Sequence, residues 1–389
     1  MTKANDSPDP TPRSEDVIAQ TTIFLFSVAL GMATVVVPLV ATASGYALGA
    51  VGFLVATSAV TQIAARAGMG VLMDRFRTRS FVLASLVLLA ASCVVLAVSQ
   101  AFWAFVVSQL LQGAARAYFF TGAQTHVVRG TRTAVSALAR MNITNGMGLL
   151  IGPLIAGLVG AWSLTAALWI AAAISGVAVF AGAFLVSYEP FTKPRPQPGI
   201  TARPVWQRPG VVTAGWMGAT AGGWRGILNS YLAVLITEAG HSIPVAGAMM
   251  TLANLAALVG SSLATPLRRL GVGASTLWGT VLAAGGTAAM ALLVPNLALA
   301  CVFLVLSGLG GGILQTLGPA LAAESVSSEE RGRSIASVGT FRAISLLVTP
   351  MGIGALVFVL PSPAIATAIV AVALGVPAMV ARRSARGDN

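Results

Sequence analysis

Charged side chains are scarce in this chain of 389 residues. Only 9% of its residues are Asp, Glu, Lys or Arg, whereas 56% are hydrophobic and the mean hydropathy is +0.86. A soluble protein of this length would need far more polar surface to cover its core. The sequence therefore predicts an integral membrane protein.

The chain also has little material for a catalytic or metal-binding centre. It contains two histidines and two cysteines, and none of its Asp or Glu residues falls in the middle of a predicted membrane span. An enzyme would need a nucleophile with a base, or a cluster of metal ligands. We therefore expect no enzymatic activity, no metal and no cofactor.

Acidic residues are the rarer charge, since 11 Asp and Glu stand against 23 Lys and Arg and give a formal net charge of +12. In a soluble chain this excess would suggest binding to nucleic acid. Here the basic residues are spread over short connections on one side of the predicted spans, where membrane insertion and anionic lipid account for them. We expect the lipid bilayer, and no nucleic acid, as a partner.

Long apolar stretches fill most of the sequence. A bilayer core about 30 Å thick requires about 20 apolar residues per helix, and this length divides the chain into twelve predicted spans. The spans run approximately over residues 17–40, 46–67, 81–99, 102–125, 135–161, 164–186, 211–237, 243–265, 275–294, 297–323, 335–360 and 364–381.

Basic residues occupy only alternate connections between these spans. Eighteen of the 23 lie in those connections or in the tails, five lie inside apolar spans, and none lies in the other connections. This asymmetry is typical of proteins of the bacterial cytoplasmic membrane, whose cytoplasmic loops are rich in Lys and Arg. Both termini should therefore be cytoplasmic, with a disordered tail over residues 1–16 and a second tail over residues 382–389.

The longest connection, residues 187–209, holds six prolines and four basic residues. This composition predicts an extended cytoplasmic linker between an N-terminal six-helix bundle, residues 17–186, and a C-terminal one, residues 210–381. A weak repeat supports the division, because Arg129-Gly130 and Arg331-Gly332 are each followed, eleven residues after the arginine, by another arginine. The pattern favours duplication of a six-helix unit.

The connection after the second span carries a motif, GVLMDRFRTR over residues 70–79. It resembles the signature of the major facilitator superfamily, although Arg77 and Thr78 stand where that family usually has Gly and Arg. The matching residues are Gly70, Leu72, Asp74, Arg75 and Arg79. The resemblance implies an all-α membrane fold with twelve transmembrane helices in two six-helix bundles, related by pseudo-two-fold symmetry, and a transporter that works by alternating access.

Asp74 stands among basic residues at the predicted cytoplasmic mouth. One interpretation is a solvated loop carboxylate. The other, which the resemblance favours, is a conformational latch formed by Gly70, Asp74, Arg75 and Arg79, in which the carboxylate meets a basic side chain or a helix N-terminus and is released when the bundles rock.

The fifth span is similar to a Gly- and Pro-containing motif of the antiporter branches of that family. The matching residues are Gly148, Gly152, Pro153 and Gly157, whereas Ala156 departs from the motif. Glycines four residues apart allow helices to approach closely, and Pro153 removes a backbone donor and bends the helix. Ordinary packing of small residues would also explain the glycines. The motif favours export over import.

Five arginines lie inside apolar spans, where a guanidinium costs at least ~2.5 to 3.5 kcal/mol on insertion scales. Arg116 and Arg225 are nearest to mid-span, in spans that family members place around the central cavity. Gln109 and Gln112 share a helical stripe with Arg116, and Asn229 lies one turn beyond Arg225. We expect these five residues to contact substrate. The alternative is that the two arginines bind backbone carbonyls exposed at the glycine-rich breaks 222–223 or 310–312.

Arg140 and Arg342 lie two turns from the predicted cytoplasmic ends of their spans, and Arg66 lies almost at one. We treat Arg140 and Arg342 as secondary polar sites, because snorkelling or interhelical bonding would explain these three arginines equally well.

Arginine does not release its proton in the useful range, and no carboxylate is expected at mid-span. A cavity with two unpaired guanidiniums should therefore prefer an anionic or weakly acidic substrate. We expect a monomeric secondary transporter that exports a small organic molecule; if protons are the coupling ion, Glu238 and Glu324 are the remaining carriers. The alternatives are an importer or uniporter of organic anions and, more remotely, a receptor that transports nothing.

Overall fold

The computed structural model describes residues 13–73, 75–129, 134–190, 204–326, 330–360 and 362–387, and every regular element within them is a helix. The first half contains six helices. They are α1 (Arg13–Ala43), α2 (Leu48–Met73), α3 (Thr78–Val98), α4 (Phe102–Arg129), α5 (Ala134–Gly160) and α6 (Leu164–Gly182).

The second half begins with the short 3-10 turn η1 (Val205–Gln207). Two of its rods contain a π-helical segment, so that α7 continues through η2 into α8, and α10 through η3 into α11. The elements are α7 (Pro209–Ile227), η2 (Leu228–Leu232), α8 (Ala233–Glu238), α9 (Ile243–Arg268), α10 (Val272–Thr280), η3 (Val281–Gly285), α11 (Gly286–Leu293), α12 (Leu297–Glu324), α13 (Arg331–Val357) and α14 (Pro363–Gly387). The described residues thus form twelve helical rods, as predicted.

Nine helices among the described residues are long and apolar enough to cross a membrane. Two rods that do not meet this measure, α4 and α7, carry Arg116 and Arg225. Polar residues and glycines in their middle lower the mean hydropathy of both. Two of the rods that fall short of this measure are therefore the ones that carry the predicted site.

The ends of the chain differ from the predicted boundaries. We expected a disordered tail up to residue 16, but α1 begins at Arg13, and Glu15 and Asp16 lie in its first turn, where acidic side chains favour a helix start. The helix α14 continues to Gly387, past the boundary expected at residue 381. Of the predicted linker, residues 191–203 lie outside the described part, and its last residue, Pro209, already opens α7.

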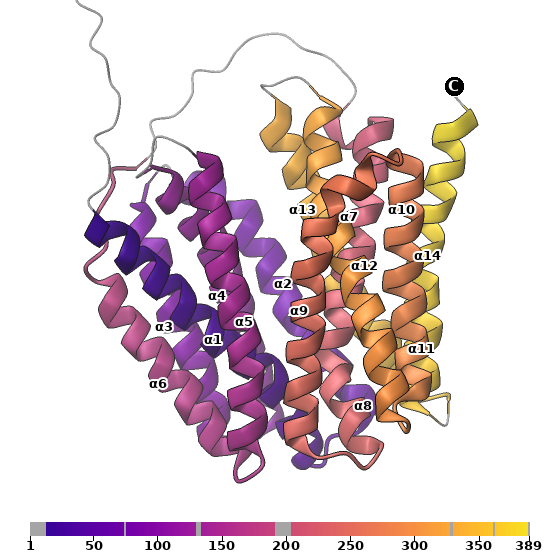
Figure 1. Cartoon of the computed structure of the whole chain (residues 1–389). Coiled ribbons are helices and arrows are strands. Elements are labelled where there is room, and N and C mark those ends of the chain that lie inside the picture. Colours follow the sequence, from indigo (N-terminus) through magenta and orange to yellow (C-terminus); the bar gives the residue numbers. More distant parts are fainter. Residues whose placement is uncertain are drawn as a thin grey trace, which may run out of the picture.

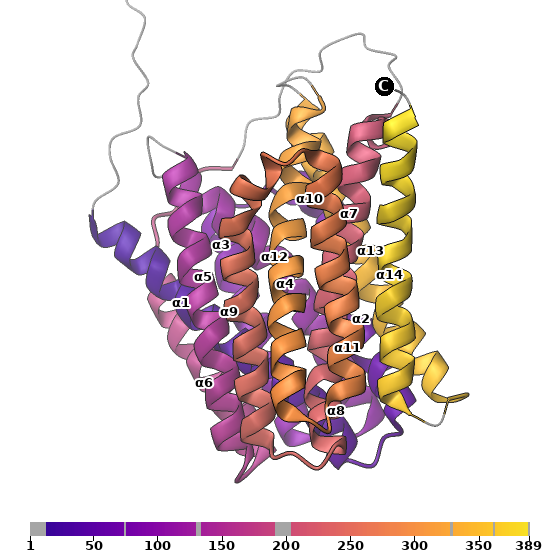
Figure 2. The same cartoon turned by 45° about the vertical axis from the view of Figure 1, so that its right-hand side comes forward.

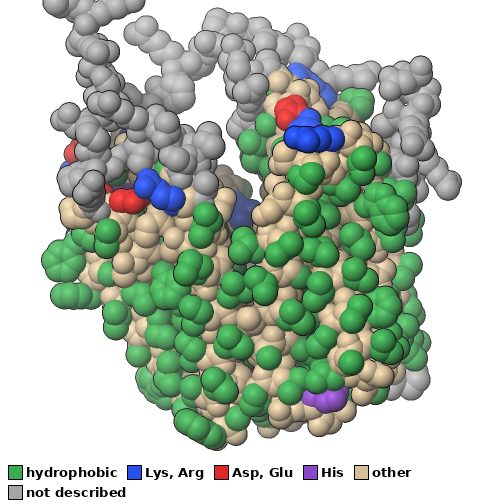
Figure 3. Space-filling model, viewed as in Figure 1, with side chains coloured by type: hydrophobic (Ala, Val, Ile, Leu, Met, Phe, Trp, Pro, Cys, Tyr) green, Lys and Arg blue, Asp and Glu red, His purple; other side chains and the backbone are tan. Residues whose placement is uncertain are grey.

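The two halves form separate bundles that stand side by side (Figures 1 and 2). Within the first, α1 packs on α5 and α6, and α3 packs on α4 and α6; within the second, α12 packs on α7 and α9, and α13 packs on α7. The bundles meet mainly through α2 against α13 and α5 against α9. We call the end where α1 begins, α6 ends, α7 begins and α14 ends the linker end. A hollow opens there between the bundles, with a basic side chain at its base (Figure 3).

At the opposite end the bundles touch backbone to backbone. A Cβ atom added to Gly247 of α9 would overlap the carbonyl oxygen of Pro153 and lie 2.9 Å from the Cα of Gly157. A Cβ added to Gly52 of α2 would overlap the carbonyl oxygen of Pro350. Only glycine fits at these two contacts, and they hold the interface closed at this end. At the linker end the interface is open.

A buried carboxylate holds the start of the linker against the first bundle. Glu15 is 6% exposed, and its two carboxylate oxygens accept the backbone N–H of Val186 at 3.0 and 3.1 Å. One of these oxygens also lies 2.9 Å from Nε2 of His126, whose Nδ1 lies 3.1 Å from the hydroxyl of Thr78. The chain that leaves α6 is thereby fixed to α1 and α4.

Replacing Glu15 with alanine is expected to lower the stability of the protein by about 1–3 kcal/mol, because it leaves a buried N–H and an imidazole without their acceptor. The thermal unfolding midpoint in detergent measures this. The matched control is Glu189→Ala, whose ion pair with Arg77 at 2.9 Å is exposed and should contribute about 0–1 kcal/mol. Equal midpoints for the two variants would contradict the anchoring role of Glu15.

Candidate functional site

A polar cavity lies between the two bundles. Its polar lining comes from Ser58 and Gln62 of α2, Arg116 of α4 and Asn229 of η2, and apolar residues of α2, α7 and α13 complete the wall. The space measures about 300 Å³, part of which is open to solvent. Since both bundles contribute, a molecule bound there would touch both halves of the protein.

Arg116 is positioned by the residue one turn before it on α4. Its guanidinium donates to Oε1 of Gln112 at 2.8 Å, which fixes the orientation of that amide and turns its NH₂ group elsewhere. Within the described residues, the Nε of Arg116 and the Nε2 atoms of Gln112 and Gln109 are buried and have no hydrogen-bond partner. The predicted stripe of α4 therefore carries three unsatisfied donors.

Arg225 lies near the end of α7, with its guanidinium 4.6 Å from the ring of Trp224. It donates to Oδ1 of Asn254 on α9 at 2.5 Å, and the amide nitrogen of Asn254 donates to the carbonyl of Leu149 on α5 at 2.9 Å. This chain of bonds links Arg225 to the opposite bundle. Among the described residues, Arg116 and Arg225 thus donate to side-chain amides, and not to the backbone carbonyls of the alternative interpretation.

The other three arginines separate into two kinds. Arg342 donates to the amide oxygen of Gln315 at 3.1 Å and is close enough to Arg225 and Arg66 to be repelled by both. Arg225 is likewise repelled by Arg116. Arg140, by contrast, is 50% exposed and pairs with Asp16 at 3.1 Å. Arg342 therefore belongs to a group of neighbouring guanidiniums, whereas Arg140 lies at the surface.

The carboxylates of the described residues lie away from this group of arginines. In the described part of the chain the ion pairs lie near the linker end, and none of them includes the four neighbouring arginines 66, 116, 225 and 342. Glu238 is exposed at the end of α8, and Glu324 is bonded to Arg268. Arg116, Arg225 and Arg342 are oriented by neutral amide oxygens, which do not offset their charge.

Asn229 lies on the π-helical segment η2 and lines the cavity, and its contact with substrate stays a prediction. Two residues further on, the hydroxyl of Tyr231 donates to the carbonyl of Leu48 at 3.0 Å, across the interface. π-Helical turns inside α-helices are frequent at functional sites. The segment η2 thus connects the cavity wall to the closed end of the interface.

The Gly- and Pro-containing motif of α5 faces two different helices. Added Cβ atoms at Gly148 and Gly152 would meet α1 within the same bundle, whereas one at Gly157 would lie 3.2 Å from the Cα of Gly247 in the other bundle. Pro153 lies inside α5. The motif therefore serves packing within the first bundle and also the contact that closes the interface.

The loop after α2 is described only in part. Asp74 lies outside the described residues, whereas Gly70 belongs to α2 and Arg75 is exposed. Arg79 donates to the carbonyl of Ala183 at the end of α6, and Arg77 donates to Ser187 at 3.1 Å. Two basic residues of this loop thus bind the end of α6 and the start of the linker, and the latch stays a prediction.

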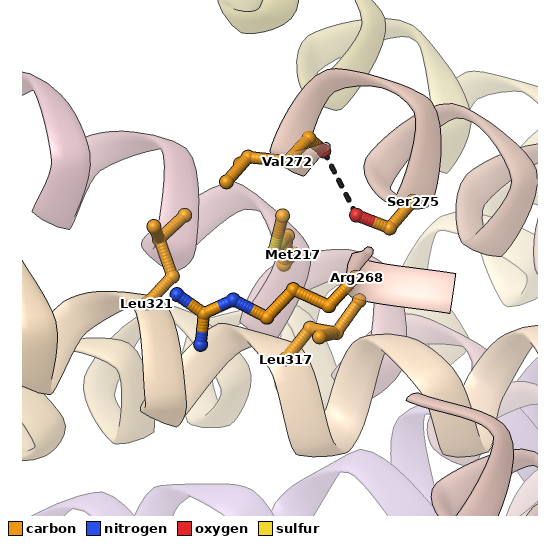
Figure 4. Close-up of a pocket in the computed structure, with 6 residues that line it drawn as sticks. All are labelled: Met217, Arg268, Val272, Ser275, Leu317 and Leu321. Carbon is orange, nitrogen blue, oxygen red and sulfur yellow. Dashed lines mark hydrogen bonds between the residues drawn. The ribbon is translucent and has the colours of Figure 1, made fainter. Parts of the chain in front are cut away.

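A second cavity of about 200 Å³ lies inside the second bundle (Figure 4). Arg268 is its charged lining residue, and Ser275 beside it donates to the carbonyl of Val272 at 3.1 Å. Because Arg268 is neutralised by Glu324, this cavity offers no unpaired charge, and the cavity between the bundles is the better candidate site.

Sequence reasoning did not identify four of the polar neighbours found here. They are Ser58, Gln62, Asn254 and Gln315. Each is a polar residue within an apolar span, which is the signal that could have found them, but no spacing rule connects residues on different helices.

Comparison with known proteins identifies the family. Residues 21–224 and 214–388 both match the model of the Major Facilitator Superfamily. The chain is 30% identical over 174 residues to the class C tetracycline resistance protein of Escherichia coli, a match that spans 43% of each chain.

Solved structures share the fold at low identity. A variant of the nucleoside transporter NupG is similar with a TM-score of 0.81 at 14% identity, over 96% of this chain and 99% of that one. The D-xylose-proton symporter is similar with a TM-score of 0.72 at 13% identity, over 94% and 96%. The chain belongs to the Major Facilitator Superfamily and is a membrane transporter of that family.

Proposed function

We propose that this chain is a secondary transporter that exports a small organic anion across the bacterial cytoplasmic membrane by alternating access. The observation that carries the proposal is the pair Arg116 and Arg225, whose guanidiniums are held by the neutral amides of Gln112 and Asn254. A guanidinium without a carboxylate offers a fork of N–H donors that fits carboxylate or phosphate oxygens.

The unsatisfied donors beside Arg116 support the same substrate class. The Nε2 atoms of Gln109 and Gln112 and the Nε of Arg116 have no acceptor among the described residues, and buried donors are costly unless an acceptor reaches them. An anion rich in acceptor oxygens would supply it. A cation would meet the like charge of Arg116 and would leave these donors without an acceptor.

The placement of the cavity supports alternating access. Ser58, Gln62 and Arg116 come from one bundle and Asn229 from the other. Rocking of the bundles would therefore expose a bound anion first to one side of the membrane and then to the other. We place the linker end in the cytoplasm because the basic connections lie there. All polar lining residues belong to one chain, so a monomer suffices.

Export rests on two observations. The motif of α5 resembles that of antiporter branches, and the partial relative is a resistance protein. An importer or uniporter is the alternative, since one protein of similar fold is a symporter. Glu238 and Glu324 do not line the cavity, so proton coupling, if present, would act from outside it. Flux in inside-out and right-side-out vesicles distinguishes the two directions.

The experiment that tests the substrate class compares charge on a fixed scaffold. Liposomes that contain the purified protein and are loaded with the same unlabelled compound are given radiolabelled phthalate, its neutral diamide or the corresponding diamine, and in parallel succinate, succinamide and 1,4-diaminobutane, with and without a pH gradient. We expect flux of the two dianions at least roughly tenfold above that of the amides and diamines, which corresponds to about 1.4 kcal/mol. Equal or faster flux of the diamines would contradict an anion site.

A further inference from the structure

The four neighbouring arginines, at positions 66, 116, 225 and 342, cannot lose their positive charge by releasing a proton. Arg116, Arg225 and Arg342 are each bonded to an amide oxygen, and the described ion pairs use none of them. A histidine or carboxylate in their place could change its charge by taking or losing a proton, but a guanidinium stays charged at every physiological pH. Arg116 lines the cavity and Arg225 and Arg342 lie on helices that help to form its wall, so the positive charge at and around the empty cavity is fixed.

This fixed charge matters most when the cavity closes. In the open form, water and salt from the hollow at the linker end (Figure 3) screen the guanidiniums from one another. Alternating access requires an intermediate in which both ends are shut. Water is then excluded, the desolvation cost of each charge rises, and so does the repulsion among these arginines. They are close in space, since Arg342 packs on Gly222 of α7, one turn before Arg225, and Arg66 reaches Gly339 of α13, one turn before Arg342. An empty carrier should pass this intermediate slowly.

A bound anion removes the obstacle, because it pairs with the guanidiniums before the site closes. From the charge of this cavity we infer that the carrier changes its orientation rapidly only with an anion bound, in both directions, and so exchanges one carboxylate- or phosphate-bearing anion for another across the membrane. This inference rests on the proposed anion site and adds a counter-substrate to it.

The test measures efflux from liposomes loaded with radiolabelled phthalate, and in parallel with succinate. They are diluted into buffer that contains either the same unlabelled dianion, inorganic phosphate, or only HEPES as a large impermeant anion. Potassium with valinomycin on both sides clamps the membrane potential, so that charge movement does not limit net efflux. We expect efflux to be at least roughly tenfold faster with an external dianion or phosphate, a barrier difference of about 1.4 kcal/mol.

The outcomes separate the two proposals. Equal efflux into all buffers, above that of protein-free liposomes, would overturn exchange and leave the anion site standing. Efflux no faster than from protein-free liposomes in any buffer would overturn the anion site itself. Acceleration by the dianion but not by phosphate would restrict the counter-substrate to carboxylates and support exchange.

A charge variant tests the cause. Arg342→Gln removes one positive charge from the group and keeps a donor for Gln315, so the ratio of exchange to net efflux should fall; Arg342→Lys, which keeps the charge, should retain the ratio. The control is Arg140→Gln, since Arg140 is exposed and pairs with Asp16. If Arg342→Gln folds and keeps the full ratio, the fixed charge is not what slows the empty carrier.

Discussion

Replacing Arg225 with glutamine is expected to reduce phthalate transport at subsaturating concentration by roughly 30-fold or more, because losing one partner of a buried charge pair costs about 2–5 kcal/mol. Glutamine keeps an N–H donor for Oδ1 of Asn254, which Arg225 contacts at 2.5 Å, so the link from α7 through α9 to Leu149 should survive. Initial rates in liposomes as a function of phthalate concentration measure the effect.

Two further variants show whether the loss comes from the charge. Arg225→Lys should keep part of the activity, because an ammonium retains the charge but not the forked geometry. Arg140→Gln removes an arginine outside the cavity and should transport at the wild-type rate. If Arg225→Gln is folded, as judged by size-exclusion elution, and has unchanged transport kinetics, Arg225 does not contact the substrate.

A leucine at position 247 is expected to hold the transporter in the form that is open at the end opposite the linker. Gly247 lies so close to Pro153 and Gly157 that even a Cβ atom overlaps, and overpacking of this kind costs about 1–3 kcal/mol or more. The free energy of the form with this interface closed would rise by this amount, whereas the form with the bundles separated at this end would be unaffected. Transport should then nearly stop, because the cycle needs both forms.

Distances between spin labels measure the shift. One label replaces Trp162, which is 89% exposed in the first bundle, and the other replaces Glu238 in the second; Cys93 and Cys301 are first changed to alanine. The distance should increase in Gly247→Leu. The matched control is Gly176→Leu, since no atom lies within 4 Å of a Cβ at Gly176. An unchanged distance in Gly247→Leu would show that the glycine contact does not close this end.

Most of the twelve rods were predictable because nine of the described helices are long and apolar enough to cross a bilayer, a property that hydropathy measures directly. The rod ends were not, because polar turns beyond the membrane carry no such signal. This explains why α1 begins at Arg13, before the expected boundary, and why α14 extends to Gly387. Arg140 illustrates the same limit: it was assigned to a span, yet it is exposed and paired with Asp16.

The site was predictable one helix at a time. The periodicity of a single helix placed Gln109, Gln112 and Arg116 on one face. Gln109 and Gln112 are buried on α4 and Arg116 is half-buried, and each has a buried donor that lacks an acceptor among the described residues. What lies opposite a face depends on how helices from distant parts of the sequence pack together. Asn254 therefore emerged only from the structure, where it joins Arg225 to the other bundle.

The π-helical segment η2 is wound more loosely than the α-helices on either side of it. It holds one residue more than an α-helical path of the same rise would. It begins three residues after Arg225 and contains Tyr231, whose hydroxyl reaches Leu48. If the segment rewound to α geometry, every side chain beyond it would turn by about 100° around the helix axis relative to those before it. Tyr231 would turn with the segment and lose its hydrogen bond to Leu48. A local change of helix geometry beside the cavity would therefore weaken the contact between the bundles at the end opposite the linker.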